Sequence, residues 1–129
     1  MSSTLIEASD SGDWATVNLL LPNADVSLRD EYGYTAFLSA VARGYLDIVR
    51  EFLFRAPCVV NDRTRCRTTA LMMAANYGYE EIVDLLLEYP ETKYDDVNVY
   101  GLDALSMAIA TKHHDIVDKL IRHSAKNLE

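Results

Sequence analysis

The chain has 129 residues, half of them hydrophobic and a quarter charged, which is typical of one globular domain. Its formal net charge of −8 at pH 7 argues against general attraction to nucleic acid or to an anionic membrane. Residues 1–10 are polar and acidic, unlike a signal or transit peptide, and no apolar run reaches the roughly 18 residues that span a bilayer.

The two cysteines, Cys58 and Cys66, form neither a CxxC pair nor a disulfide framework. A secreted domain more often carries cysteines at a spacing that staples it. We therefore expect a reducing compartment, the cytoplasm, with the nucleus as an alternative.

Three segments of similar sequence, residues 33–41, 67–75 and 101–109, begin 34 residues apart. The same register continues through Ile-Val pairs at 48–49, 82–83 and 116–117. A weaker and shorter copy lies upstream. We interpret the chain as a single domain, 1–129, of four units with approximate bounds 4–31, 32–65, 66–99 and 100–126.

Each unit carries signals for two helices. Thr35, Thr69 and Asp103 stand before apolar runs of helical spacing, where their side-chain oxygens can cap a first helix. Gly44 and Gly78 follow those runs, which predicts a left-handed helix end and a tight turn into a second helix.

The connections between units carry a family resemblance. Asn23-Ala-Asp-Val-Ser27 resembles the Gly-Ala-Asp-Val-Asn of the ankyrin repeat, and Asp30-Glu-Tyr-Gly-Tyr-Thr35 resembles its Asp-x-x-Gly-x-Thr. The resemblance covers about residues 4–124 and implies an all-α solenoid of helix-turn-helix units with hairpin-like finger loops. Ala replaces the family's Pro in three units, Arg67 and Lys112 replace glycines, and residues 88–98 predict an irregular loop.

The resemblance also implies a binding surface. In ankyrin arrays the fingers, carried over to residues 30–34, 64–68 and 98–102, and the first helices form a concave face. The candidate partner-binding residues on that face are Tyr32, Tyr34, Arg43, Arg65, Thr68, Met73, Asn76, Tyr77, Tyr100, Leu102 and Met107. Tyr and Met are enriched at interface cores, and Tyr at hot spots.

Two further expectations concern this face. Ser39 and Thr111 are expected to be exposed there, and Arg63, Arg65 and Arg67 alternate along one finger, where they can meet an acidic or phosphorylated segment of a partner. Each has an alternative reading: finger tyrosines that only pack on neighbouring fingers, arginines that form a solvated edge, and Met73 and Met107 as ordinary core.

The end units are expected to present polar outer faces, as in a self-capped array. The polar residues assigned to these faces are Ser9, Asp10, Asp13 and Asn18 in the first unit and His114, Asp118, Arg122 and Lys126 in the last.

Motifs for catalysis are missing from the sequence. The five glycines are isolated, no serine sits in a nucleophile elbow, and neither cysteine has a histidine at a recognisable spacing. We expect no enzyme activity, no cofactor and no metal, and a monomer that binds another protein but neither nucleic acid nor membrane. The predicted function is a protein–protein interaction module or adaptor; the alternative is a structural spacer or scaffold segment of a longer protein.

Overall fold

The computed structural model describes residues 2–127. Within this range the chain forms eight α-helices and two short 3-10 helices, with isolated bridges but no strand. The helices form consecutive pairs: α1 (Ser2–Ser11) with α2 (Trp14–Leu20), α3 (Ala36–Arg43) with α4 (Leu46–Arg55), α5 (Ala70–Tyr77) with α6 (Glu80–Leu87), and α7 (Ala104–Ala110) with α8 (His114–Asn127). The short helices η1 (Leu21–Asn23) and η2 (Pro57–Asn61) follow α2 and α4. The all-α solenoid is thus confirmed.

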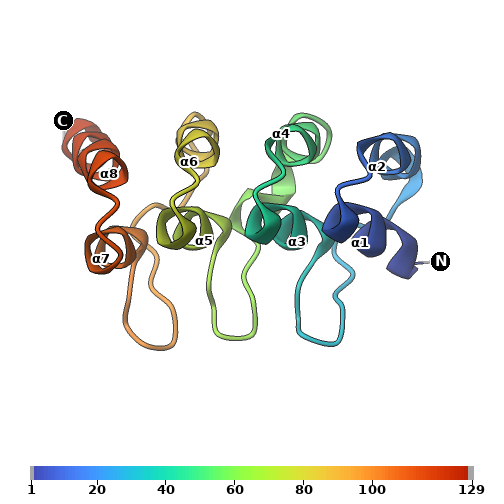
Figure 1. Ribbon diagram of the computed structural model, residues 1–129, viewed down its shortest axis with the longest axis horizontal. Coiled ribbons are helices and arrows are strands. Elements are labelled where there is room, and N and C mark those ends of the chain that lie inside the picture. Colours follow the sequence, from blue (N-terminus) through green and yellow to red (C-terminus); the bar gives the residue numbers. More distant parts are fainter. Residues whose placement is uncertain (1, 128–129) are drawn as a thin grey trace.

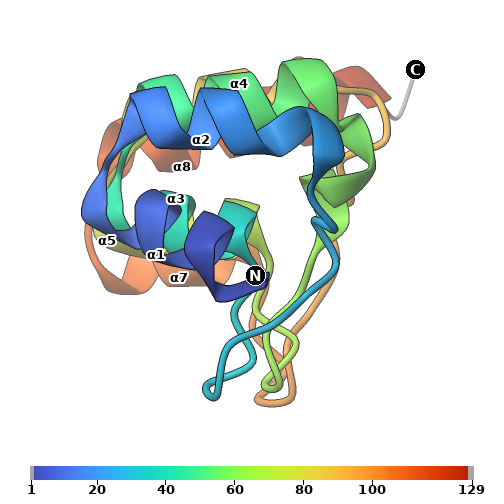
Figure 2. The same ribbon diagram turned by 90° about the vertical axis from the view of Figure 1, so that its right-hand side faces the viewer.

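The four pairs stand side by side in two layers. Helices α1, α3, α5 and α7 form one layer, and α2, α4, α6 and α8 form the other (Figure 1). Three hairpin loops project beyond the first layer, and the end-on view shows all three on the same side of the molecule (Figure 2). The fingers and the first helices therefore share one face.

The predicted helix ends are confirmed. The side chains of Thr35, Thr69 and Asp103 accept hydrogen bonds from the amide three residues later, at 3.2, 3.2 and 2.8 Å. Gly44 and Gly78 end α3 and α5 with φ of 77° and 81°. A residue without Cβ adopts this left-handed conformation at little cost, so the chain can turn at once into the second helix.

A continuous apolar core joins the two layers and the four pairs. Phe37 of α3 and Phe52 of α4 are fully buried and meet edge to face, with ring centroids 6.0 Å apart. The valines at positions 49 and 83 are also completely buried. Because each pair covers the side of its neighbour, burial depends on the stack as a whole.

A repeated hydrogen-bond pattern closes each finger. Asp30, Thr64 and Asn98 occupy the same position in successive units, and the side chain of each accepts a hydrogen bond from the amide four residues later. The backbone amide of each also donates to the carbonyl four residues later. The bounds predicted for the fingers, 30–34, 64–68 and 98–102, coincide with these closed turns.

The expectation of polar end faces is wrong in part. Ser9 is completely buried in α1, and its hydroxyl has no hydrogen-bond partner among the described residues. It lies next to buried Ala8 and one helical turn from buried Leu5, on the buried side of α1. At the other end Ile109 and Ile121 are 57% and 50% exposed. Ile109 occupies the position of buried Ala75 one unit earlier, which the next pair covers. The other residues assigned to the end faces are exposed or half-buried.

Candidate protein-binding groove

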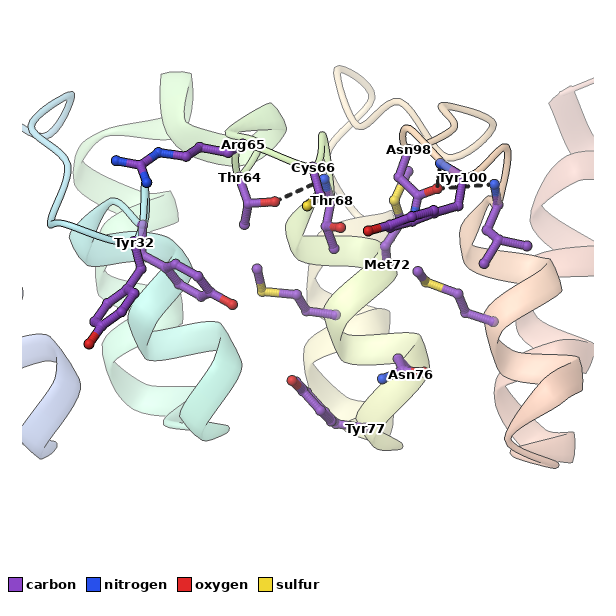
Figure 3. Close-up of a pocket in the computed structure, with 14 residues that line it drawn as sticks. Tyr32, Thr64, Arg65, Cys66, Thr68, Met72, Asn76, Tyr77, Asn98 and Tyr100 are labelled. Carbon is purple, nitrogen blue, oxygen red and sulfur yellow. Dashed lines mark hydrogen bonds between the residues drawn. The ribbon is translucent and has the colours of Figure 1, made fainter.

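A concave groove of about 350 Å³ lies between the fingers and the first helices (Figure 3). The predicted partner-binding residues that line it are Tyr32, Tyr34, Arg65, Thr68, Met73, Asn76, Tyr77, Tyr100, Leu102 and Met107. Three fingers and two first helices contribute to this set. The solenoid therefore gathers side chains that the sequence places one or two units apart.

Arg43 lies outside this groove but on the same face. It lines an adjoining concavity of about 880 Å³, to which Tyr32, Tyr34 and Tyr77 also contribute. The Nε atom of Arg43 is 3.1 Å from Oδ1 of Asp10, and this hydrogen bond raises the pKa of the guanidinium. Its charge is thus balanced by α1 before any partner arrives.

The groove has an aromatic rim. Tyr32, Tyr77 and Tyr100 are 69%, 52% and 73% exposed, which is unusual for such large rings. Tyr34 is half-buried, and burial raises the pKa of its hydroxyl, with smaller contributions from Tyr77 and the Asp30 carboxylate. The rim thus offers both exposed ring surface and tyrosine hydroxyl groups.

The floor of the groove differs from the prediction. Met73 is buried, with 4% of its surface exposed, although the first-helix candidates were expected to be exposed. Ser39, which lines the adjoining concavity, is buried to the same extent against the same expectation. Met73 lies on α5, which packs on α3 at one side and on α7 at the other. Met107 on α7 is half-buried, and Thr111 is exposed as expected. Met73 therefore belongs to the core and also forms part of the groove floor.

Four lining residues were not among the named candidates: Thr64, Cys66, Met72 and Asn98. Three of them, Thr64, Cys66 and Asn98, lie within the predicted fingers 64–68 and 98–102. Because of the 34-residue repeat, Thr64 and Asn98 occupy the position that Asp30 has in the first finger. This equivalence could have identified these two residues as candidates. Figure 3 shows the polar turns at their place in the wall, with Thr64 bonded to Thr68. Cys66 is exposed, and its carbonyl accepts a hydrogen bond of 3.0 Å from the Val99 amide of the next finger.

The side chains that could react or bind a metal are the two cysteines and the histidines. Both cysteines are free and exposed. The Nδ1 atom of His113 lies 2.8 Å from the Thr111 hydroxyl and 3.1 Å from the Ala75 carbonyl oxygen, where it joins α8 to the preceding unit. Over the described residues, no three His, Cys, Asp or Glu side chains gather as a metal site would require.

The family model for ankyrin repeats in three copies matches residues 5–94 and, in a second position, residues 40–129. The chain belongs to the ankyrin repeat family. It is 32% identical over 123 residues to dauer abnormal formation protein 25 of Caenorhabditis elegans. The aligned stretch covers 94% of this chain and 31% of that protein.

Other ankyrin relatives are similar over shorter stretches. Protein fem-1 homolog A-like of Mus musculus is 33% identical over 99 residues, or 77% of this chain and 15% of that protein. The ankyrin repeat and KH domain-containing protein mask of Drosophila melanogaster is 33% identical over 93 residues, or 68% of this chain and 2% of that protein. The chain thus spans less than a third of each of these relatives. No described helix has the length and apolar character needed to cross a membrane.

Proposed function

We propose that this ankyrin repeat chain is a non-catalytic, monomeric module that holds a segment of a partner protein in its concave groove. The observation that carries the proposal is the convergence of the candidate residues on one groove. Ankyrin repeats in general serve protein–protein interaction. Free, exposed Cys58 and Cys66 favour a reducing compartment, cytoplasmic or nuclear, as the place where it acts.

The groove has the composition of an interface. Its exposed tyrosine rings offer large apolar area at a low cost in conformational entropy, and the half-buried side chain of Met107 can adapt to irregular partners. The Asn76 amide and the tyrosine hydroxyls can hydrogen-bond a partner backbone. A partner that covers Tyr32 and Tyr77 therefore buries apolar ring surface and gains polar contacts from their hydroxyl groups.

The decisive experiment is capture of partners from the source cell with the wild type and with a Tyr32→Ala/Tyr77→Ala double variant, read by quantitative mass spectrometry. Phe54→Ala is the matched control, because Phe54 is an aromatic side chain, 79% exposed, on α4 in the other layer. We expect at least one protein to be depleted about tenfold or more by the double variant and retained by the control.

Equal capture by the wild type and the double variant contradicts a groove site. Loss with Phe54→Ala alone assigns binding to the second layer instead. If no variant changes the captured set, the spacer function fits better, and the flanking parts of a longer protein become the place to look. Circular dichroism and thermal melting of each variant ensure that loss of capture does not reflect unfolding.

A further inference from the structure

Four arginines surround a third concavity, of about 490 Å³, at the fingers. We call Arg29, Arg63, Arg65 and Arg67 the arginine cluster; Asn61, Asp62 and Thr64 complete the lining. The cluster holds four of the 12 basic side chains of a protein whose net charge is −8. Thr64 and Arg65 line both this concavity and the groove, so the two are contiguous.

Two members of the arginine cluster connect neighbouring fingers. The Nη1 atom of Arg29 donates to the carbonyl oxygens of Gly33 and Arg63, each at 2.6 Å. The Nη1 atom of Arg63 lies 3.6 Å from Oδ2 of Asp96, two residues before the third finger. A guanidinium has five N–H donors, so both side chains keep further donors for a ligand.

In the described part of the chain, the other two members of the arginine cluster, Arg65 and Arg67, do not connect fingers through hydrogen bonds or ion pairs. Among the described residues, neither Arg65 nor Arg67 forms a side-chain hydrogen bond or an ion pair. The stem of Arg65 crosses the backbone of Gly33, where a Cβ added to the glycine would lie 2.8 Å from Cγ of Arg65. Figure 3 shows its guanidinium group reaching toward the finger that carries Tyr32. The charge of Arg65 therefore stays available at the edge of the groove.

Arg67 is unfavourable for the stability of the fold. Its φ is 64°, a left-handed conformation in which an L side chain crowds its own backbone and which glycine adopts without that cost. It also adds a positive charge to a finger that already has two. Among the described residues no hydrogen bond or ion pair of the Arg67 side chain offsets this strain, so its guanidinium remains available to a ligand.

One carboxylate, that of Asp62, lines the concavity, and one of its oxygens already accepts a hydrogen bond. Oδ2 of Asp62 accepts a hydrogen bond of 2.9 Å from the Thr35 hydroxyl, and burial raises the pKa of the Asp62 carboxyl, although this hydrogen bond and Arg29 oppose the shift. Asp62 in the lining and Asp96, which pairs with Arg63, thus place two carboxylates beside four guanidinium groups, and the cluster keeps an excess of positive charge. The Thr64 hydroxyl oxygen accepts from the Thr68 amide, which leaves its hydrogen free to donate.

We propose that the arginine cluster binds the phosphate group of a phosphorylated serine or threonine on the partner segment, an inference that rests on the proposed function of the adjoining groove. A phosphate monoester carries about −1.5 to −2 charges at neutral pH and offers three acceptor oxygens, which several guanidinium forks can share. A carboxylate has one charge and two oxygens, so it satisfies fewer of the donors. Arg65, which lines both sites, joins the phosphate contact to the groove.

The first test uses N-acetyl-O-phosphoserine amide as the probe and NMR of the arginine Nε–Hε groups as the readout. We expect saturable shifts at Arg65 and Arg67, and at least tenfold weaker binding of N-acetylglutamic acid amide. Absence of saturation overturns the proposal, as do equal shifts at Arg50 and Arg122, which lie outside the concavity. Equal affinity for the glutamate probe overturns the choice of phosphate.

The second test compares Arg67→Gly with Lys112→Gly. Lys112 is the matched control because it has the same left-handed conformation, with φ of 63°, and the same charge, but lies away from the fingers. Both substitutions relieve strain, so both proteins should fold. We expect Arg67→Gly to weaken binding of the phosphoserine probe about tenfold and Lys112→Gly to leave it unchanged. An equal loss in both variants indicates a general charge effect and overturns the proposal.

The two proposals fail in different ways. Phosphatase treatment of the lysate should deplete the partner from the wild-type capture, whereas the Tyr32→Ala/Tyr77→Ala variant should still bind the phosphoserine probe. If the tyrosine variant loses the partner but phosphatase treatment does not, the groove stands and the phosphate site is wrong. If the probe binds and the tyrosine variant keeps the partner, the phosphate site stands and the groove is wrong.

Discussion

The hydroxyl of Tyr79 donates a hydrogen bond of 3.1 Å to the carbonyl oxygen of Ala42 in the preceding unit. The ring of the same tyrosine lies against Gly44, so that a Cβ added there would be 2.9 Å from the ring atom Cζ. Tyr45 makes the corresponding ring contact with Gly12. A ring placed on the turn glycine of the unit before it thus joins consecutive units at two of the interfaces.

The hydroxyl of Tyr79 should contribute to stability where that of Tyr45 does not. Tyr79→Phe removes the hydrogen bond to the half-buried carbonyl oxygen of Ala42. We therefore expect the free energy of unfolding to fall by about 1 kcal/mol. Tyr45→Phe is the control, because the Tyr45 hydroxyl makes no hydrogen bond among the described residues. Urea unfolding of both variants, followed by circular dichroism, measures the difference; equal losses would show that the bond adds nothing.

The turn glycines should differ in their tolerance of a side chain. Gly44 and Gly101 both have φ of 77°, but a Cβ on Gly101 would meet no atom within 4 Å. Gly101→Ala should therefore cost only the left-handed backbone strain, about 1 kcal/mol. Gly44→Ala adds the clash with the Tyr79 ring and should cost about 2–3 kcal/mol. Thermal and urea denaturation compare them, and a similar loss in both means that the ring moves aside freely.

Arg67 and Lys112 both have a left-handed backbone conformation, and replacing either with glycine should stabilise the protein. Lys112→Gly and Arg67→Gly each remove a strained side chain, with φ of 63° and 64° in the native protein. Relief of the strain should raise the free energy of unfolding by about 1 kcal/mol in each variant. The greater conformational entropy of glycine in the unfolded chain reduces this gain. A fall in stability for either one, measured by urea unfolding, would mean that its side chain makes a stabilising contact.

Asp62 should make the protein less stable as the pH rises. Burial raises the pKa of its carboxyl in the folded state above the ordinary value of 3.8, with the Thr35 hydrogen bond and Arg29 acting in the opposite direction. A raised pKa means that the folded state favours the protonated carboxyl. Its contribution is complete below pH 3.8 and declines as the pH rises through the folded pKa.

Asp62→Asn isolates this effect, because the amide oxygen can still accept the Thr35 hydrogen bond but cannot ionise. The variant should match the wild type at low pH and exceed its stability at neutral pH. Unfolding curves recorded from pH 3 to 8 show the difference between the two proteins. A difference that is independent of pH, or that grows on acidification, contradicts the raised pKa.

Much of the fold was predictable because its signals are local and repeated. A threonine before an apolar run caps a helix through an amide three residues later, and a glycine after it permits the left-handed turn; both depend on neighbours within one helical turn. The fingers were predictable for a similar reason, since Asp30, Thr64 and Asn98 close their turns within five residues. The partner-binding role of the groove residues stays a prediction.

The sequence alone therefore determined the repeated units, their helices and their turns, and the resemblance to ankyrin repeats implied the face on which the candidate residues lie. Only the tertiary structure decided which side chains on that face are covered: Met73 became part of the floor, and Ser9 entered the core. It also decided that Arg29 joins three arginines of the next finger, and that Tyr79 bonds Ala42 across a unit boundary. The physical reason is that burial and contacts between units depend on how neighbouring helix pairs stack in space, and residues 34 positions apart become neighbours only in the folded array.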